Sequence, residues 1–145
     1  MQFSTAIVSL MAMAAGAFAQ VATTASYDPV YDTSSLSTLS VTCSDGTNGL
    51  YTKGYQTLGA LPGFPRVGAI ETVTQWNSPN CGKCYKVTWT DTGASINIIG
   101  VDRATSGIVL SLGALNELTG GQGVNLGRVN VSYVETAATD CGYPA

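Results

Sequence analysis

The sequence has 145 residues, of which 45% are hydrophobic and only 10% are charged, whereas an average soluble domain is about 25% charged. With six basic residues and a net charge of -3, the chain lacks the concentrated positive charge by which proteins bind nucleic acid. The absence of histidine excludes Ser-His-Asp and Cys-His nucleophile systems, histidine general bases and histidine metal ligands.

Residues 1–19 have the features of a secretory signal peptide. The apolar run from Ala6 to Phe18 is shorter than the ~20 residues that a helix needs to span a bilayer. It ends in the small-x-small pattern Ala17-Phe18-Ala19, directly before Gln20. The alternatives are a membrane anchor and a buried helix. We therefore expect a signal peptide at 1–19, one domain at 20–145 and no membrane span, in a protein secreted to the extracellular space or cell wall.

The predicted elements that follow are short and mostly extended. Residues 20–40 are polar and rich in serine and threonine, and 57–68 are irregular because glycine and proline recur there. Apolar and alternating segments predict strands at 36–42, 69–73, 84–90, 95–102 and 127–135. A helical turn is expected at 50–55, and leucine spacing predicts a helix at 110–118 that Gly120-Gly121 ends. Several short strands favour a small closed β structure, since closure leaves no exposed sheet edge.

Four cysteines fall in the predicted domain, namely Cys43, Cys81, Cys84 and Cys141. An even number in a small secreted domain predicts two disulfides, and loop-closure entropy does not choose among the possible pairings. The CxxC motif at 81–84 has a zinc site and a redox site as alternatives. Zinc would need a second ligand pair, and a redox CxxC normally begins a helix, whereas strand-like residues follow here.

Several motifs resemble those of the cerato-platanins, which are small secreted fungal proteins. The matching segments are Tyr27–Tyr31, Cys43–Leu50, Thr57–Gly68, Trp76–Tyr85 and the final Cys141. The resemblance implies a six-stranded double-psi β-barrel like that of expansin N-terminal domains, barwin-like proteins and one class of endoglucanases. It also implies disulfides between Cys43 and Cys81 and between Cys84 and Cys141.

The resemblance also implies a function. Such a protein binds chitin-type N-acetylglucosamine oligomers and cell-wall polysaccharide, with cellulose as a further candidate, loosens the wall in an expansin-like way and elicits plant defence, without a cofactor. Two alternatives are a surface-active, self-assembling structural protein, which low charge and high apolar content favour, and a weak glycoside hydrolase. Hydrolysis usually needs two carboxylates about 5 to 10 Å apart, and no acidic residue has the context of a second one. We therefore expect no enzymatic activity.

The resemblance places the sugar site around Asp102. This residue directly follows the apolar segment Ile96–Val101, and its Gly-Val-Asp context matches the aspartate that the family links to sugar binding. The alternative is that Asp102 caps a turn or pairs with Arg103. The other expected sugar contacts are Tyr27, Asn48 and Ser111.

Aromatic faces offer a further means of binding sugar, because the C–H bonds of a pyranose ring stack on them. Tyr27 lies near the start of the domain, and Trp76 lies beside a turn. Packing and binding are both open for these two side chains. Trp89 alternates with polar residues and is expected in the core.

One modification site is visible in the sequence. Asn130-Val131-Ser132 is an N-glycosylation sequon. It falls within a predicted strand, so that Asn130 would face away from its apolar neighbours.

Overall fold

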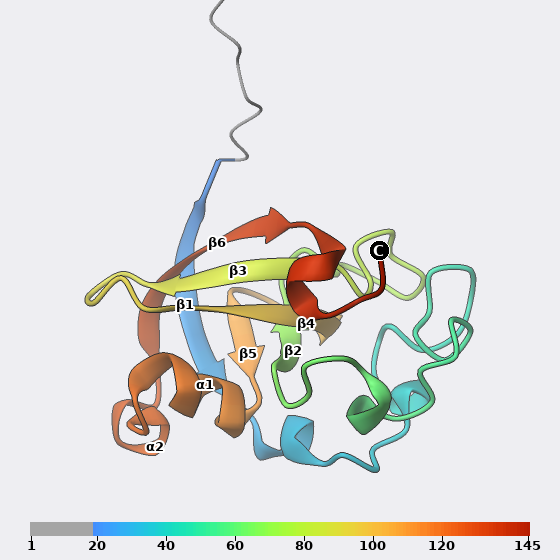
Figure 1. Cartoon of the computed structure of the whole chain (residues 1–145), viewed down its shortest axis with the longest axis horizontal. Coiled ribbons are helices and arrows are strands. Elements are labelled where there is room, and N and C mark those ends of the chain that lie inside the picture. Colours follow the sequence, from blue (N-terminus) through green and yellow to red (C-terminus); the bar gives the residue numbers. More distant parts are fainter. Residues whose placement is uncertain (1–18) are drawn as a thin grey trace, which may run out of the picture.

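The structure, a computed structural model, describes residues 19–145. The predicted signal peptide, apart from its last residue, lies outside the described residues. Six strands form a closed barrel in the order β1-β5-β2-β4-β3-β6 (Figure 1). The strands are β1 (Val21–Tyr27), β2 (Val67–Ile70), β3 (Cys84–Trp89), β4 (Ser95–Arg103), β5 (Ile108–Leu110) and β6 (Val129–Thr136).

The pairing of the strands closes the barrel. The first strand, β1, is antiparallel to β6 and parallel to β5, while β2 is parallel to β4. The remaining pairs, β2 with β5 and β3 with both β4 and β6, are antiparallel. Every strand thus has two neighbours and no edge is exposed. The predicted fold class, a mainly β six-stranded barrel with short helices and two disulfides, is confirmed.

Alternation along the strands fills the barrel with apolar side chains. In β6, Val129, Val131 and Tyr133 are buried, and the residues between them are exposed or half-buried. Ile98 and Leu110 are fully buried, and each such side chain stabilises the fold by about 1.5–3 kcal/mol. Trp89 packs against this core, as expected. The packed interior gives the loops at the barrel ends a rigid base.

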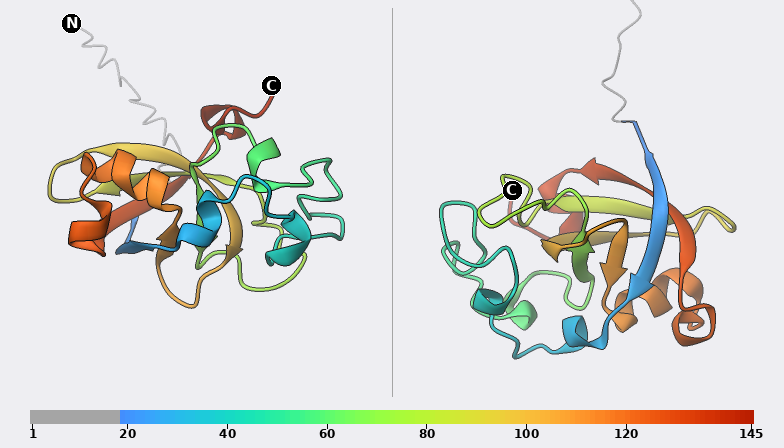
Figure 2. Two further views of the ribbon diagram at one scale, coloured as in Figure 1. Left: turned by 90° about the horizontal axis from the view of Figure 1, so that it is seen from below. Right: turned by 180° about the vertical axis from the view of Figure 1, so that it is seen from behind.

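Helices and long loops lie at opposite ends of the molecule (Figures 1 and 2). Two α-helices, α1 (Leu112–Thr119) and α2 (Gly123–Leu126), lie at one end. The long connection between β1 and β2 runs to the other end, and only short 3-10 turns interrupt it. The 3-10 turns of the chain are η1 (Pro29–Asp32), η2 (Thr38–Ser40), η3 (Leu58–Ala60) and η4 (Ala138–Cys141).

The prediction for the first strand is wrong because pairing between distant segments decides where that strand lies. The strand expected at 36–42 is absent, and η2 with a single bridge between Ser37 and Thr57 takes its place. The first strand is instead β1, whose residues bury little except Ala25 and so give no clear alternation. Its backbone is ordered by its neighbours β5 and β6.

The helix expected at 110–118 begins later, because Ile108–Leu110 pair as strand β5. The strand expected at 69–73 is shifted to Val67–Ile70. The strands expected at 84–90, 95–102 and 127–135 are confirmed to within two residues at each end.

Both disulfides join distant parts of the chain. Cys43 is bonded to Cys81, and Cys84 to Cys141. These are the pairs that the resemblance implies. Because the two cysteines of the CxxC motif have separate partners, the thiols are not available as a redox pair or as zinc ligands in this state.

The first turn of α1 is capped by residues from two segments. The side chain of Ser111 accepts a hydrogen bond from Ala114 N at 3.0 Å. Asp32, which ends η1, accepts from Leu112 N at 2.7 Å and from Gly113 N at 2.8 Å. A carboxylate at this position satisfies two helix donors and also faces the positive end of the helix dipole.

We predict that Asp32→Ala lowers the free energy of unfolding by about 1–2 kcal/mol, the usual effect of losing a helix cap. Urea denaturation of both proteins measures the difference. Asp91→Ala is the matched control, because Asp91 lies in an exposed turn. An equal loss in the two variants would show that charge, not capping, matters.

Candidate functional site

Asp102 lies near the end of β4, with its side chain half-buried. One carboxylate oxygen, Oδ2, accepts a hydrogen bond from the Tyr31 hydroxyl at 2.7 Å. The other, Oδ1, accepts from Thr42 N at 2.8 Å, from Thr42 Oγ1 at 2.6 Å and from Arg103 N at 2.9 Å. This carboxylate therefore ties η1 and the segment before Cys43 to the barrel.

The Tyr31 hydroxyl is a permanent donor in this arrangement. Burial, and next the hydrogen bond to Asp102, raise the pKa of Tyr31 far above its usual range. The phenol thus stays protonated at any physiological pH. Three of the four donors around Asp102 bind Oδ1 and one binds Oδ2. Because each carboxylate oxygen has about two acceptor positions, Oδ1 is fully engaged and Oδ2 keeps one position open. The contacts of Oδ1 match the turn-capping alternative.

A second group of polar and aromatic residues lies on the adjoining loops, and we call it the Trp76 surface: Asp45, Gly46, Asn48, Trp76 and Asn77. The Trp76 side chain is 56% exposed, yet its Nε1 donates to Asp45 Oδ1 at 2.7 Å. Gly46 lies against the indole, since a Cβ there would be 2.9 Å from Trp76 Cζ2. The ring is therefore exposed but held in one orientation.

Two asparagines fasten the loops that carry this surface. Asn48 N donates to Asn77 Oδ1 at 2.9 Å, and Asn48 Nδ2 donates to Asn77 O at 3.0 Å. Asn77 has a φ of 58°, a left-handed conformation that asparagine tolerates better than most residues. The bond between Cys43 and Cys81 joins the same two loops. Hydrogen bonds between the two asparagines and one disulfide therefore hold the two loops of this surface together.

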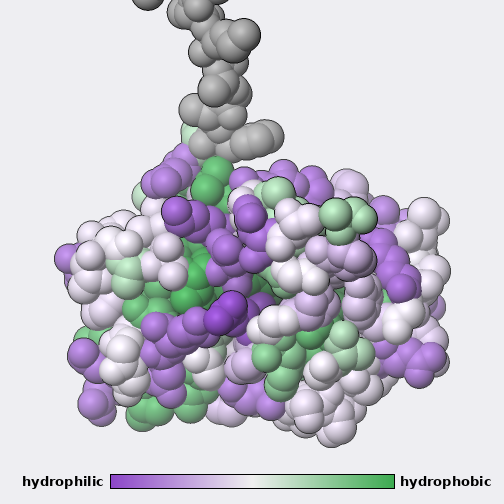
Figure 3. Space-filling view, viewed as in Figure 1, coloured by the Kyte–Doolittle hydropathy of each residue, from purple (hydrophilic) through white to green (hydrophobic). Residues whose placement is uncertain are grey.

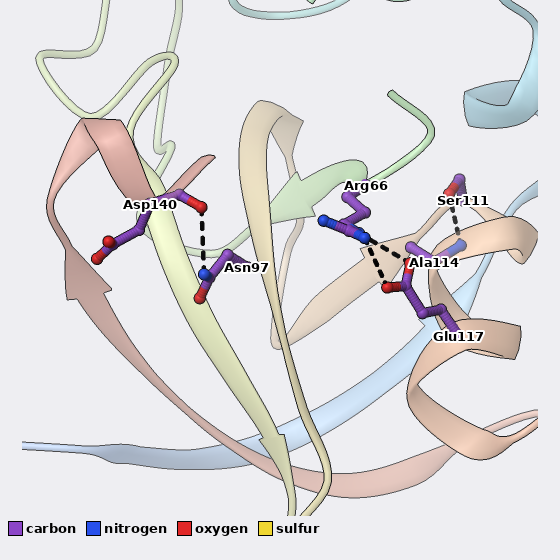
Figure 4. A network of polar contacts seen from close by, with 6 residues as sticks. All are labelled: Arg66, Asn97, Ser111, Ala114, Glu117 and Asp140. Atoms are coloured by element: carbon purple, nitrogen blue, oxygen red, sulfur yellow. Dashed lines mark hydrogen bonds and ion pairs between the residues drawn. The ribbon is translucent and has the colours of Figure 1, made fainter. Parts of the chain in front are cut away.

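The four expected sugar contacts do not form one set. Ser111 is fully buried, where it caps α1 through Ala114 N (Figure 4) and donates to Pro65 O. Tyr27 is half-buried against the core at the end of β1. Asn48 belongs to the Trp76 surface, and Asp102 anchors the loops beside it. Ser111 thus has no surface to offer a ligand, because its position at the start of α1 buries it.

The sequence left Trp76 open between packing and binding, and the exposure of its side chain excludes a position in the core. A tryptophan beside Asn77-Ser78-Pro79, a turn sequence rather than a strand, was the available signal. Its partner Asp45 is 31 residues away along the chain. No spacing rule connects the two.

Further polar contacts hold α1 and η4 to the barrel. Arg66 forms a two-pronged ion pair with Glu117, through Nε at 2.8 Å and Nη2 at 2.8 Å. Asn97 Nδ2 donates to Asp140 O at 3.2 Å (Figure 4). Hydrophilic residues gather across the middle of the face seen in Figure 3. These contacts join α1 to the residue before β2, and η4 to β4.

Glu71, which follows the neighbouring strand β2, also accepts hydrogen bonds within the fold. Ala69 pairs with Asp102, and two residues on, Glu71 accepts hydrogen bonds from the Tyr133 hydroxyl at 2.7 Å and from Gly107 N at 2.5 Å. Burial, followed by the bond to Glu71, raises the pKa of Tyr133 well above its usual range. Glu71 and Asp102 each therefore serve as acceptors within the fold.

The sequon lies in β6. Asn130 is exposed, between the buried residues Val129 and Val131, so its side chain is accessible to a modifying enzyme. Glycosylation of Asn130 stays a prediction. In the described part of the chain, no helix combines the length and apolar character needed to cross a membrane.

Comparison with known families and relatives gives consistent matches. The cerato-platanin family model matches residues 23–143. An Arthroderma benhamiae protein, "Allergen Asp f 15 homolog", is 48% identical over 120 residues, which are 83% of this chain but only 58% of that protein. "Cerato-platanin" of Ceratocystis fimbriata f. sp. platani is 43% identical over 134 residues, 92% of this chain and 94% of that protein.

Solved structures show the same barrel. Cerato-platanin 3 from M. perniciosa has a TM-score of 0.81 and 45% identity, covering 85% of this chain and 100% of that one. The fungal elicitor Cerato-Platanin has a TM-score of 0.73 and 44% identity, with 81% and 95% covered. A mutant Clavibacter michiganensis expansin in complex with cellohexaose has a TM-score of 0.57 and 17% identity, with 82% and 51% covered. This last likeness concerns the fold alone.

We predict that Asp102→Asn destabilises the protein, because an amide replaces one acceptor with a donor that would face N–H or O–H groups. Hydrogen bonds to a charged group contribute about 1.5–3 kcal/mol each. The loss should be about 2 kcal/mol, or roughly 5–10 °C in Tm. Tyr31→Phe removes a single bond and should have a smaller effect. An unchanged Tm in Asp102→Asn would contradict the anchoring role.

Proposed function

Because this chain belongs to the cerato-platanin family, we propose that it is a secreted, non-catalytic protein that binds chitin-type N-acetylglucosamine oligomers through the Trp76 surface. Cellulose is the second candidate partner, since the expansin with a similar fold was solved with cellohexaose. The name of one structural relative, a fungal elicitor, supports elicitor activity as part of the proposal.

The observation that carries this proposal is the exposed and immobilised indole of Trp76. A flat π face in contact with water is suited to stacking against the C–H bonds of a sugar ring. Because the hydrogen bond to Asp45 and the contact with Gly46 already fix the ring, binding does not have to order it. Polar groups of Asp45 and Asn48 lie at its border, where sugar hydroxyls would need partners.

Ligand contact and turn capping, the two alternatives for Asp102, fall to different residues in this proposal. Asp102 anchors the loop at Thr42, and three residues of the Trp76 surface, Asp45, Gly46 and Asn48, follow directly on that loop. Asp102 therefore supports binding as a positioning residue. Expansin-like loosening would follow if this surface binds one polysaccharide chain in place of a neighbouring chain, so that the contact between the two chains is lost without either being cut.

A surface-active role is supported by a separate observation. The α2 helix exposes Val124 by 60% and Leu126 by 40%, at the barrel end opposite the long loops. These side chains could contact an air–water interface while the Trp76 surface stays in water. The two functions are therefore compatible.

We predict that Trp76→Ala weakens binding of N-acetylglucosamine oligomers by about tenfold, the effect expected when a tryptophan carries most of a contact. Trp76→Phe keeps an aromatic ring but loses the hydrogen bond to Asp45, so its affinity should lie between those of the unaltered protein and Trp76→Ala. Leu39→Ala, at another exposed apolar side chain, is the control. Isothermal titration of all three measures the affinities. If Trp76→Ala binds as the unaltered protein does, the stacking site is elsewhere.

We predict that the protein releases no reducing ends from chitin, cellulose or soluble β-glucans above the background of a buffer blank. Glu71 and Asp102 are both held as acceptors inside the fold, whereas hydrolysis needs an acid and a base free to face the substrate. A reducing-sugar assay with each polymer tests this. Turnover that disappears in Asp102→Ala would overturn the non-catalytic proposal.

A further inference from the structure

A pocket of about 370 Å³ lies beside the CxxC motif and is separate from the indole of Trp76. Its size is at the lower end of small-molecule sites, enough for one sugar ring. Two lysines, a tyrosine and small or apolar residues line it: Lys53, Pro79, Cys81, Gly82, Lys83, Ala138 and Tyr143.

Because Gly82 has no side chain, the Tyr143 hydroxyl and the Lys53 ammonium can lie close to its backbone. Gly82 has a φ of 76°, and a Cβ there would lie 3.4 Å from the Tyr143 hydroxyl and 4.0 Å from Lys53 Nζ. A phenol and an ammonium thus meet over the same bare stretch of backbone. Gly82 N donates to Gly100 O at 2.8 Å, which fixes this stretch to β4.

The walls of the pocket are rigid. Cys81 and Cys84, on either side of the floor, are bonded to Cys43 and Cys141. The ring of Tyr143, two residues beyond the second bridge, packs edge-on against Tyr55 with centroids 5.8 Å apart. A ligand would therefore meet a preformed site, which lowers the entropic cost of binding.

The charge of the pocket contrasts with that of the chain. The protein has six basic residues and a net charge of -3, yet two of the six, Lys53 and Lys83, line this pocket. Lys83 is paired with Glu135 at 2.8 Å. Among the described residues, no carboxylate lies within ion-pair distance of Lys53. Its ammonium is left to pair with an acidic group from outside.

Tyr143 supplies a neutral donor next to this ammonium. Burial raises the pKa of Tyr143 well above its usual range, so the hydroxyl keeps its proton. An ammonium and a phenol together match the two oxygens of a carboxylate. The ring of Tyr143 and the side chains of Pro79 and Ala138 offer apolar contact to the rest of the ligand.

We propose that this pocket binds a carboxylate-bearing sugar, a uronate residue of an acidic polysaccharide, with Lys53 and Tyr143 holding the carboxylate over Gly82. The inference extends the proposed function to a second class of saccharide and a second site. The apolar walls favour a ring-bearing acid over a small free carboxylate. They also favour it over an acidic peptide, whose flexible side chains have no ring to place against Tyr143.

The test is a calorimetric titration with oligogalacturonate, carried out at low ionic strength and again with added salt. Lys53→Gln should weaken binding by about tenfold, since a charge-assisted hydrogen bond at an exposed site contributes toward the lower end of its range. Lys53→Arg should restore most of the affinity. Lys86→Gln, which removes the same charge from an exposed residue of β3, should change little. Added salt should weaken binding by the unaltered protein.

Several results would overturn the proposal. One is an absence of oligogalacturonate binding, and another is an equal loss in Lys53→Gln and Lys86→Gln, which would indicate diffuse attraction. Equal affinity for acetate or for oligoglutamate would show that the pocket does not select a sugar. Trp76→Ala separates this proposal from the one above, because it should reduce binding of N-acetylglucosamine oligomers and leave oligogalacturonate binding intact.

Discussion

The carboxylate of Asp102 is the contact on which the loop end of the molecule depends. The barrel closes through its own backbone hydrogen bonds, but the connection between β1 and β2 has no strand pairing beyond one bridge. Its order has to come from tertiary contacts. Asp102 supplies three of them, one to Tyr31 and two to Thr42, at the point where the connection passes the end of β4.

The other anchors of this connection extend from the same place. Asp32, next to Tyr31, caps α1, and Cys43, next to Thr42, is bonded to Cys81. One short segment thus reaches the helix end of the molecule, and the other reaches the CxxC loop. Both candidate binding regions, the Trp76 surface and the pocket over Gly82, are built on the loops fixed in this way. We therefore propose that Asp102 supports both regions by holding these loops in place.

Local pattern was enough to predict the elements whose side chains alternate. Cys84–Trp89 and Val129–Thr136 carry a clear period of two, and their sequence predicted them. The β1 strand has no such alternation, because its pairing with β5 and β6 rather than its own side-chain pattern makes it extended. The disulfide pairing came from the resemblance, because spacing alone left it open. A closed barrel with parallel pairs is non-local, and single-sequence patterns do not determine such pairing.

The site was less predictable than the fold for the same reason. Two of the residues that donate to Asp102 are 71 and 60 positions away, so these hydrogen bonds could not be seen in the sequence. Ser111 shows the opposite error, because a polar residue at a helix start is as well suited to capping as to binding. Residue-resolved NMR titration with N-acetylglucosamine oligomers tests the central claim most directly. The account predicts saturable shifts at Asp45, Asn48, Trp76 and Asn77, with β3 and β6 unchanged. Shifts confined to the face of Arg66 and Asn97, or no shifts at saturating oligomer, would contradict it.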